Sequence, residues 1–158
     1  MKLTTLFLSL CLLMVGCRKP GPQSTVRMAD LHTTRQLVSG FYQLEAGAWR
    51  WTSKECTVML KVPEGASGNG GVLTLQGSLP EGALQNGPLT VSASVRGTAL
   101  APQTFSKQGE MIYRVDVPAA ALSHPNVLAV FTVDKVFQFP GDKRQLGIVA
   151  SVISLRAK

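Results

Sequence analysis

The sequence predicts an all-β fold, an antiparallel two-sheet β-sandwich of about nine short strands. Apolar and polar residues alternate with a period of two in most windows after residue 38. Turns rich in glycine, proline and serine separate these windows at short intervals. No helix pattern fits the same windows. The predicted strands cover residues 40–45, 48–52, 55–62, 72–79, 89–96, 98–105, 110–117, 127–133, 135–139 and 146–155.

The alternation gives each strand one apolar face. Val58 and Leu60 share a face of residues 55–62, and Leu73 and Leu75 share a face of residues 72–79. Two sheets of this kind can bury their apolar faces against each other, which favours a sandwich. The continuous apolar runs at residues 127–133 and 148–153 indicate central strands. Within the strand-rich part of the chain, Pro118 opens the one segment, residues 119–124, in which a short helical turn is predicted.

Ahead of these strands, the chain starts with a short apolar leader that stops at a cysteine. Lys2 precedes an apolar run over residues 3–15, and the small Gly16 stands directly before Cys17. The run is too short to span a bilayer comfortably, so residues 1–16 are predicted to be a cleaved signal peptide. A plain secretory signal and a lipid-attachment signal are both compatible with this leader.

The junction of Gly16 and Cys17 resembles the lipobox of bacterial lipoproteins. That resemblance implies a diacylglycerol on the Cys17 thiol, acyl chains such as palmitate in the membrane, and a location in the bacterial cell envelope. Arg18 stands where an aspartate would favour retention in the inner membrane. The resemblance therefore favours the outer membrane, with the domain facing the periplasm.

Between the anchor and the strands, residues 17–37 are predicted to be a flexible tether, so that the domain covers residues 38–158. Proline and glycine are frequent near its start, and a short helical turn is expected within residues 28–37. Its basic residues suit anionic lipid head groups. His32 is interpreted as a solvated tether residue. The basic residues of this segment are Arg18, Lys19, Arg27 and Arg35.

The cysteines and the net charge exclude other classes of protein. Cys11 leaves with the leader, Cys17 is the anchor, and Cys56 remains alone in a strand, where it is predicted to pack as a small hydrophobe. The net charge is +7. Because there is no basic run, no nucleic-acid-binding motif and an export signal, nucleic acid is excluded as a partner.

Several short pieces of residues 38–155 together resemble the jelly-roll, carbohydrate-binding-like accessory domains of bacterial envelope proteins, which are related in shape to galactose-binding-like modules. This resemblance implies a jelly-roll form of the sandwich. The family contains sugar binders and modules without a known ligand, so the fold alone implies no activity. The pieces are Gly40-Phe41-Tyr42, Glu45, Arg50-Trp51, Gly141-Asp142, Arg144 and Leu146-Gly147.

Trp49 and Trp51 are the first candidates for ligand contact. They are two residues apart, so in a strand both side chains lie on the same face. They can form a stacking platform for sugar, they can fill the core, or a bulge at Arg50 can separate them. Burial of at least one of them is favoured, because large aromatic residues of a sandwich mostly lie in the core. Phe137 and Phe139 are interpreted as packing residues.

A second set of candidates pairs arginines with carboxylates. Tyr42, one of the residues of the resemblance, is a further candidate for ligand contact. Such pairs can grip sugar hydroxyls, and they can equally tie two loops together; the structural interpretation is favoured. The residues are Glu45, Arg50, Asp142 and Arg144.

The sequence offers little basis for catalysis. No spacing singles out a pair of carboxylates, and His124 lies in a turn. We therefore expect no catalytic residue, no metal site and no cofactor, although structural calcium stays open. The favoured function is that of a non-catalytic envelope lipoprotein displaying an interaction module for protein or glycan. The alternatives are a dedicated carbohydrate-binding module that uses Trp49 and Trp51, and a small envelope hydrolase.

Overall fold

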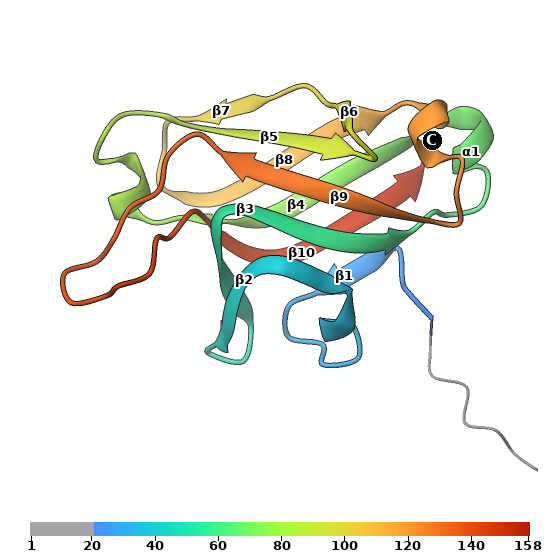
Figure 1. Ribbon diagram of the computed structural model, residues 1–158. Helices are drawn as coiled ribbons and strands as arrows, with labels where there is room; N and C mark the ends of the chain where they lie inside the picture. Colours follow the sequence, from blue (N-terminus) through green and yellow to red (C-terminus); the bar gives the residue numbers. More distant parts are fainter. Residues whose placement is uncertain (1–20) are drawn as a thin grey trace, which may run out of the picture.

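The structure is a computed structural model that describes residues 21–158, so the predicted signal peptide and Cys17 lie outside the described residues. It is dominated by antiparallel β-strands (Figure 1). The strands are β1 (Thr25–Arg27), β2 (Leu37–Glu45), β3 (Trp49–Lys61), β4 (Gly71–Leu79), β5 (Leu89–Val95), β6 (Thr98–Ala99), β7 (Gln103–Phe105), β8 (Gly109–Val117), β9 (Asn126–Val133) and β10 (Val149–Ala157). The helical elements are α1 (Ala66–Asn69) and the 3-10 turns η1 (Thr34–Gln36), η2 (Glu81–Leu84) and η3 (Ala119–Leu122).

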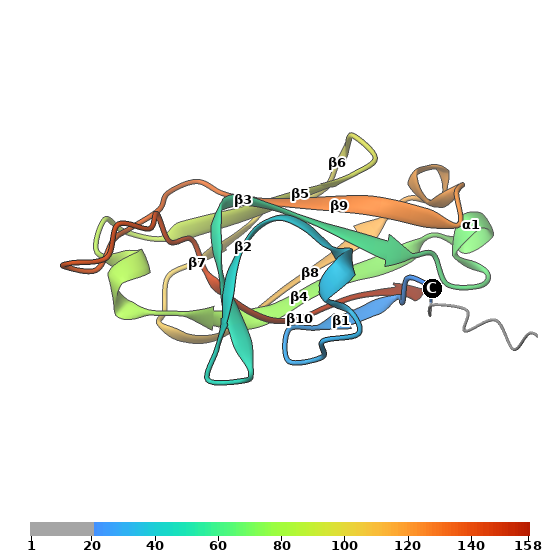
Figure 2. The same cartoon turned by 60° about the horizontal axis from the view of Figure 1, so that its bottom comes forward.

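The strands form one curled sheet in place of the two separate sheets predicted. Its central order is β6-β5-β9-β3-β10-β4-β8, with β1 beside β10, β2 beside β3 and β7 beside β5. The two predicted strands at residues 48–52 and 55–62 are one 13-residue strand, β3. Its first part pairs with β10 and its second part with β9, so one strand connects both halves of the sheet. Figures 1 and 2 show these halves facing each other.

The core between the two halves confirms the predicted alternation. β5 and β8 each bury every second residue, and the predicted core residues of β3 and β4 are fully buried. Cys56 is 2 % exposed and packs in this core, as predicted. Burial raises the pKa of its thiol to about 12, with a further contribution from the negative charge of Glu55, so the thiol stays protonated and unreactive.

The N-terminal segment pairs with β10 at the point where the pairing of β10 with β3 ends. One edge of β10 pairs with β3 at Val149 and Ala150, and then with β1 over residues 152–154. Val26 and Met28 enter the core, with exposures of 0 % and 1 %. The predicted flexible tether of residues 17–37 is therefore corrected: from Thr25 onward the chain belongs to the fold.

Gln36 fixes this segment in place. Its buried side chain accepts a hydrogen bond from the Gln23 N–H (2.9 Å) and donates to the carbonyl oxygens of Gln23 (2.8 Å) and Met59 (2.7 Å). The Lys61 N–H also donates to the Gln23 carbonyl (3.1 Å). The Gln36 amide thus joins the start of the described chain to β3. Gln36 lies in η1, which falls within the segment of residues 28–37 where a helical turn was predicted.

Other departures from the predicted strands lie in the connections. Residues 98–105 form two short strands, β6 and β7, and residues 135–139 form no strand, because only Phe137 pairs, with Leu146. The helical turn expected after Pro118 is present as η3.

The edges β7 and β8 are joined by a side chain. The Gln103 amide donates to the Arg114 carbonyl (2.6 Å) and accepts from the Arg114 N–H (3.2 Å).

Candidate functional site

The hairpin of β2 and β3 positions most of the predicted ligand-contact residues. Its turn contains Ala46 and Gly47, both with positive φ (50° and 63°), which is the geometry of a tight hairpin turn. Glu45 pairs with Trp49 across this turn, and Leu44 pairs with Arg50. The strand end therefore carries a carboxylate, an indole and a guanidinium within a few residues of one another.

Arg144 connects this hairpin to the loop of residues 134–148. Its Nη1 donates to Glu45 Oε1 (2.8 Å), and its Nη2 and Nε donate to Asp142 Oδ2 (2.7 and 3.0 Å). The backbone N–H of Arg144 also donates to Asp142 Oδ1 (2.9 Å). These hydrogen bonds hold the pKa of the Asp142 carboxyl below its ordinary value and raise the pKa of Arg144. Both groups stay charged, and the cluster is an ion-pair network.

Tyr42 and Arg50 support the same network from the hairpin. The Arg144 guanidinium lies over the Tyr42 ring, 5.4 Å from its centroid, and the Tyr42 hydroxyl donates to the Gln145 carbonyl (3.0 Å). Arg50 Nη1 donates to the Tyr42 carbonyl (2.9 Å). Arg50 therefore acts inside the hairpin and does not join the two carboxylates. Its Nε is buried and has no hydrogen-bond partner within residues 21–158.

The aromatic residues beside this network form a small cluster with one open side. Trp51 is 6 % exposed and makes edge-to-face contacts with Trp49, Phe137 and Phe139, at centroid distances of 5.5, 5.7 and 6.0 Å. Trp49 and Trp51 share one face, as predicted. Trp51 belongs to the core and is not part of an exposed platform. Trp49 is half-buried and Phe139 is 42 % exposed.

The structure thus brings all seven predicted ligand-contact residues to one region and distributes them over different roles. Arg50 and Trp51 are structural. We name the remaining surface the hairpin-end cluster; Phe139, which sequence reasoning assigned to packing, is its most exposed aromatic residue. The spacing of two residues between Phe137 and Phe139 is the sequence pattern that indicates a shared face. Which surface Phe139 covers depends on the path of the loop. The hairpin-end cluster consists of Tyr42, Glu45, Trp49, Phe139, Asp142 and Arg144.

The chemistry of the hairpin-end cluster is that of hydrogen bonding and stacking. A guanidinium carries five N–H donors, and Arg144 uses three of them, on Nε, Nη1 and Nη2. Two N–H groups and Glu45 Oε2 have no protein partner in the described part of the chain. Over the same residues, no group of three or more His, Cys, Asp or Glu side chains could hold a metal ion.

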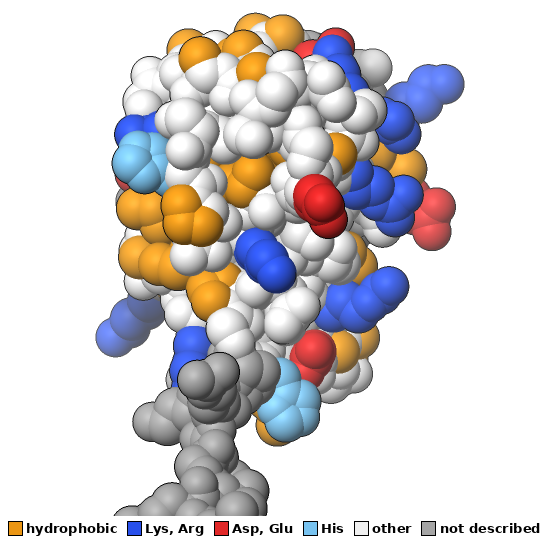
Figure 3. Space-filling view, turned by 90° about the vertical axis from the view of Figure 1, so that its right-hand side faces the viewer, with side chains coloured by type: hydrophobic (Ala, Val, Ile, Leu, Met, Phe, Trp, Pro, Cys, Tyr) orange, Lys and Arg blue, Asp and Glu red, His pale blue; other side chains and the backbone are white. Residues whose placement is uncertain are grey.

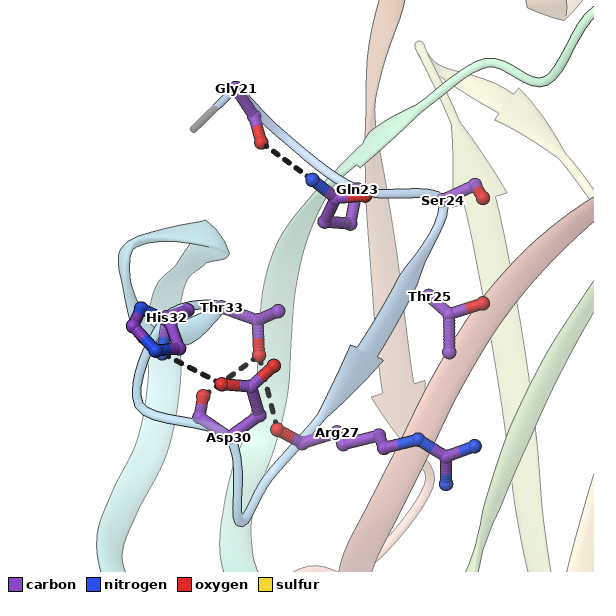
Figure 4. A pocket seen from close by; sticks show the side chains of 8 residues that line it. All are labelled: Gly21, Gln23, Ser24, Thr25, Arg27, Asp30, His32 and Thr33. Atoms are coloured by element: carbon purple, nitrogen blue, oxygen red, sulfur yellow. Dashed lines mark hydrogen bonds between the residues drawn. The ribbon is translucent and has the colours of Figure 1, made fainter. Parts of the chain in front are cut away.

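A second feature of the surface is a polar hollow beside the start of the described chain. Lys and Arg side chains lie on both sides of this point (Figure 3). The hollow has a volume of about 560 Å³, and Figure 4 shows His32 and Thr33 on the loop that follows β1, opposite Ser24 and Thr25. His32 is exposed, as expected for a solvated residue, and its backbone N–H donates to Asp30 Oδ1 (2.9 Å).

Among residues 21–158, no helix is both long enough and apolar enough to cross a membrane.

Comparisons with known proteins find likeness in structure only. No family model matches the sequence, and no curated protein matches it. A family GH115 4-O-methyl-α-glucuronidase with specificity for decorated arabinogalactans superposes with a TM-score of 0.56 at 9 % identity, over 88 % of this chain. The chain spans 18 % of the length of that enzyme. A CBM35 from Paenibacillus barcinonensis gives a TM-score of 0.41 at 12 % identity, over 87 % of this chain and 92 % of that one. The likeness to the glucuronidase shows a shared all-β fold.

Proposed function

We propose that the protein is a non-catalytic, lipid-anchored protein of the bacterial envelope whose jelly-roll-like β domain binds glycan at the hairpin-end cluster. The observation that carries the proposal is Arg144. Two carboxylates fix its guanidinium over the Tyr42 ring, yet two of its N–H donors have no protein partner within residues 21–158. The half-buried Trp49 is paired with Glu45, one of these two carboxylates, and Phe139 is 42 % exposed. A sugar needs this combination of fixed hydrogen-bonding groups and an apolar face for its C–H groups.

The fixed geometry of Arg144 favours binding over a purely structural role. A guanidinium that is already oriented loses little further side-chain entropy when it donates to a ligand hydroxyl. Glu45 Oε2 can accept a hydrogen bond from a neighbouring hydroxyl. The shared fold with part of an enzyme that acts on decorated arabinogalactans supports a glycan as the class of ligand.

Replacing Arg144 with glutamine tests this proposal. We expect Arg144→Gln to weaken retention on glycan by about tenfold or more, because hydrogen bonds to a charged group contribute about 1.5–3 kcal/mol. Affinity electrophoresis through gels that contain arabinogalactan or the host's own envelope polysaccharide measures the change. Lys143→Gln removes the same charge from the exposed neighbouring side chain and is the matched control.

The thermal midpoint of each variant separates binding from folding. If Arg144 only ties the hairpin to the loop, Arg144→Gln will lower the midpoint while the retention of the folded fraction stays unchanged. That result would favour the protein-contact alternative over glycan binding.

The proposed anchor, Cys17, is close in sequence to the folded domain. Gln23 is already bonded to Gln36 and Lys61, so only residues 18–22 separate the anchor from the fold. Six fully extended residue steps reach about 20 Å. Such an anchor holds the domain almost against the lipid surface, and Arg18 favours the outer membrane with the domain in the periplasm.

Replacing Cys17 with serine is expected to move the protein from the membrane fraction to the soluble fraction. The serine hydroxyl does not accept the diacylglycerol, and without acyl chains no stable anchor remains. Fractionation with a high-salt wash measures the distribution. If the Cys17→Ser protein stays with the membrane after the wash, Cys17 is not the anchor.

A further inference from the structure

The loop between β1 and η1, residues 28–33, lies beside the start of the described chain. Gly21 lines one hollow together with Arg27 and His32, and a second hollow together with His32 and Arg35. Gly21 follows Cys17 by four residues, which reach about 14 Å when extended. If Cys17 carries acyl chains, this loop is therefore held next to the membrane surface.

The surface of this loop suits contact with lipid. Leu31 is 72 % exposed, the highest exposure recorded for a large hydrophobic residue of the described chain. Arg27 and Arg35 flank it and are exposed. Figure 4 shows Arg27 extending away from the loop, where its charge stays accessible. An exposed leucine between cations matches the boundary between acyl chains and head groups.

The charge around the loop points to anionic lipid. Residues 18–37 contain four Lys or Arg residues and one acidic residue, Asp30. The Asp30 carboxylate accepts the His32 N–H within the loop. Val38, 52 % exposed, follows η1 at the start of β2, whereas Ile112, 57 % exposed, lies on β8, which β10 and β4 separate from β1. Position, an apolar tip and positive charge thus coincide at this loop.

We propose that the β1–η1 loop docks on an anionic bilayer, with Leu31 inserted at the level of the head groups and Arg27 and Arg35 contacting lipid phosphates. This inference rests on the proposed anchor at Cys17. The acyl chains fix the distance of the domain from the membrane, and the loop fixes its orientation, because a second contact point prevents free rotation about the tether.

Environment-sensitive fluorescence of the full chain, produced in a bacterial host, tests the docking. A Leu31→Cys protein is labelled with a nitrobenzoxadiazole maleimide, and an Ile112→Cys protein is the matched control; Cys56 is 2 % exposed and does not react. The proteins are bound to phosphatidylcholine vesicles with and without 30 % phosphatidylglycerol. We expect a blue shift and several-fold protection from aqueous iodide at position 31 in the anionic vesicles, and neither at position 112. Adding Arg35→Gln should reduce the protection about fivefold.

The outcomes for the anchor and for the loop are separable. Equal iodide access at positions 31 and 112 in vesicles that retain the protein overturns the docking and leaves the anchor intact. If a high-salt wash removes the protein from the vesicles, the proposed anchor is wrong. The docking of the loop is then tested separately, by binding the labelled Leu31→Cys, Cys17→Ser protein to anionic vesicles without a wash. Insertion of the label at position 31 supports the docking, and a label exposed to water overturns it.

Discussion

A Gly77→Ala protein is expected to lose about 3 kcal/mol or more of its free energy of unfolding. A Cβ atom at Gly77 would collide with the carbonyl oxygen of Val149 and would lie 2.9 Å from its carbonyl carbon. These are backbone atoms of the paired strand β10, so no side-chain rotation relieves the contact. The alanine must force β4 and β10 apart in the middle of the sheet.

Gly68→Ala is the matched control for this substitution. A Cβ atom at Gly68 meets no atom within 4 Å, and the residue lies in α1. We expect it to be neutral or slightly stabilising, because alanine favours helix more than glycine does. Urea denaturation followed by tryptophan fluorescence measures both variants. Equal midpoints for the two alanine variants would contradict the close approach of β4 and β10.

A Met28→Ala protein is expected to lose about 2–5 kcal/mol of its free energy of unfolding, as other deletions of buried core side chains do. Met28, directly after β1, is 1 % exposed, whereas Leu31, three residues later, is 72 % exposed. The same measurement on Leu31→Ala should show almost no change. If residues 17–37 were a flexible tether, both variants would be as stable as the original protein.

The strands that the sequence predicts well are those with an uninterrupted period of two. β4, β5 and β8 lie within one residue of their predicted bounds, because each has one face in the core. β1 was missed because a three-residue strand after proline and glycine has no period to detect. Residues 135–139 also alternate, yet they cover the aromatic cluster as a loop. Alternation of apolar and polar residues indicates that one side of a segment is buried, but it does not require the segment to pair with another strand.

The residue types of the candidate site were predictable, but their roles were not. The order of the chain places Asp142 near Arg144, whereas the ion pair between Arg144 and Glu45 joins residues 99 apart. The period of two placed Trp49 and Trp51 on one face. Only the folded loop, with Phe137 and Phe139, decides that Trp51 is buried while Trp49 is only half-buried.

The pairing of β1 with β10 also has a consequence for the order of folding. Residues 25–27 find their partners at residues 152–154, and β10 lies between the strands of both halves of the sheet. The sheet cannot be completed until the last strand has been synthesised, and contacts so distant in the sequence form slowly. A protein of the proposed envelope location therefore stays incompletely folded, and can still cross a membrane as an extended chain, for as long as this strand is missing.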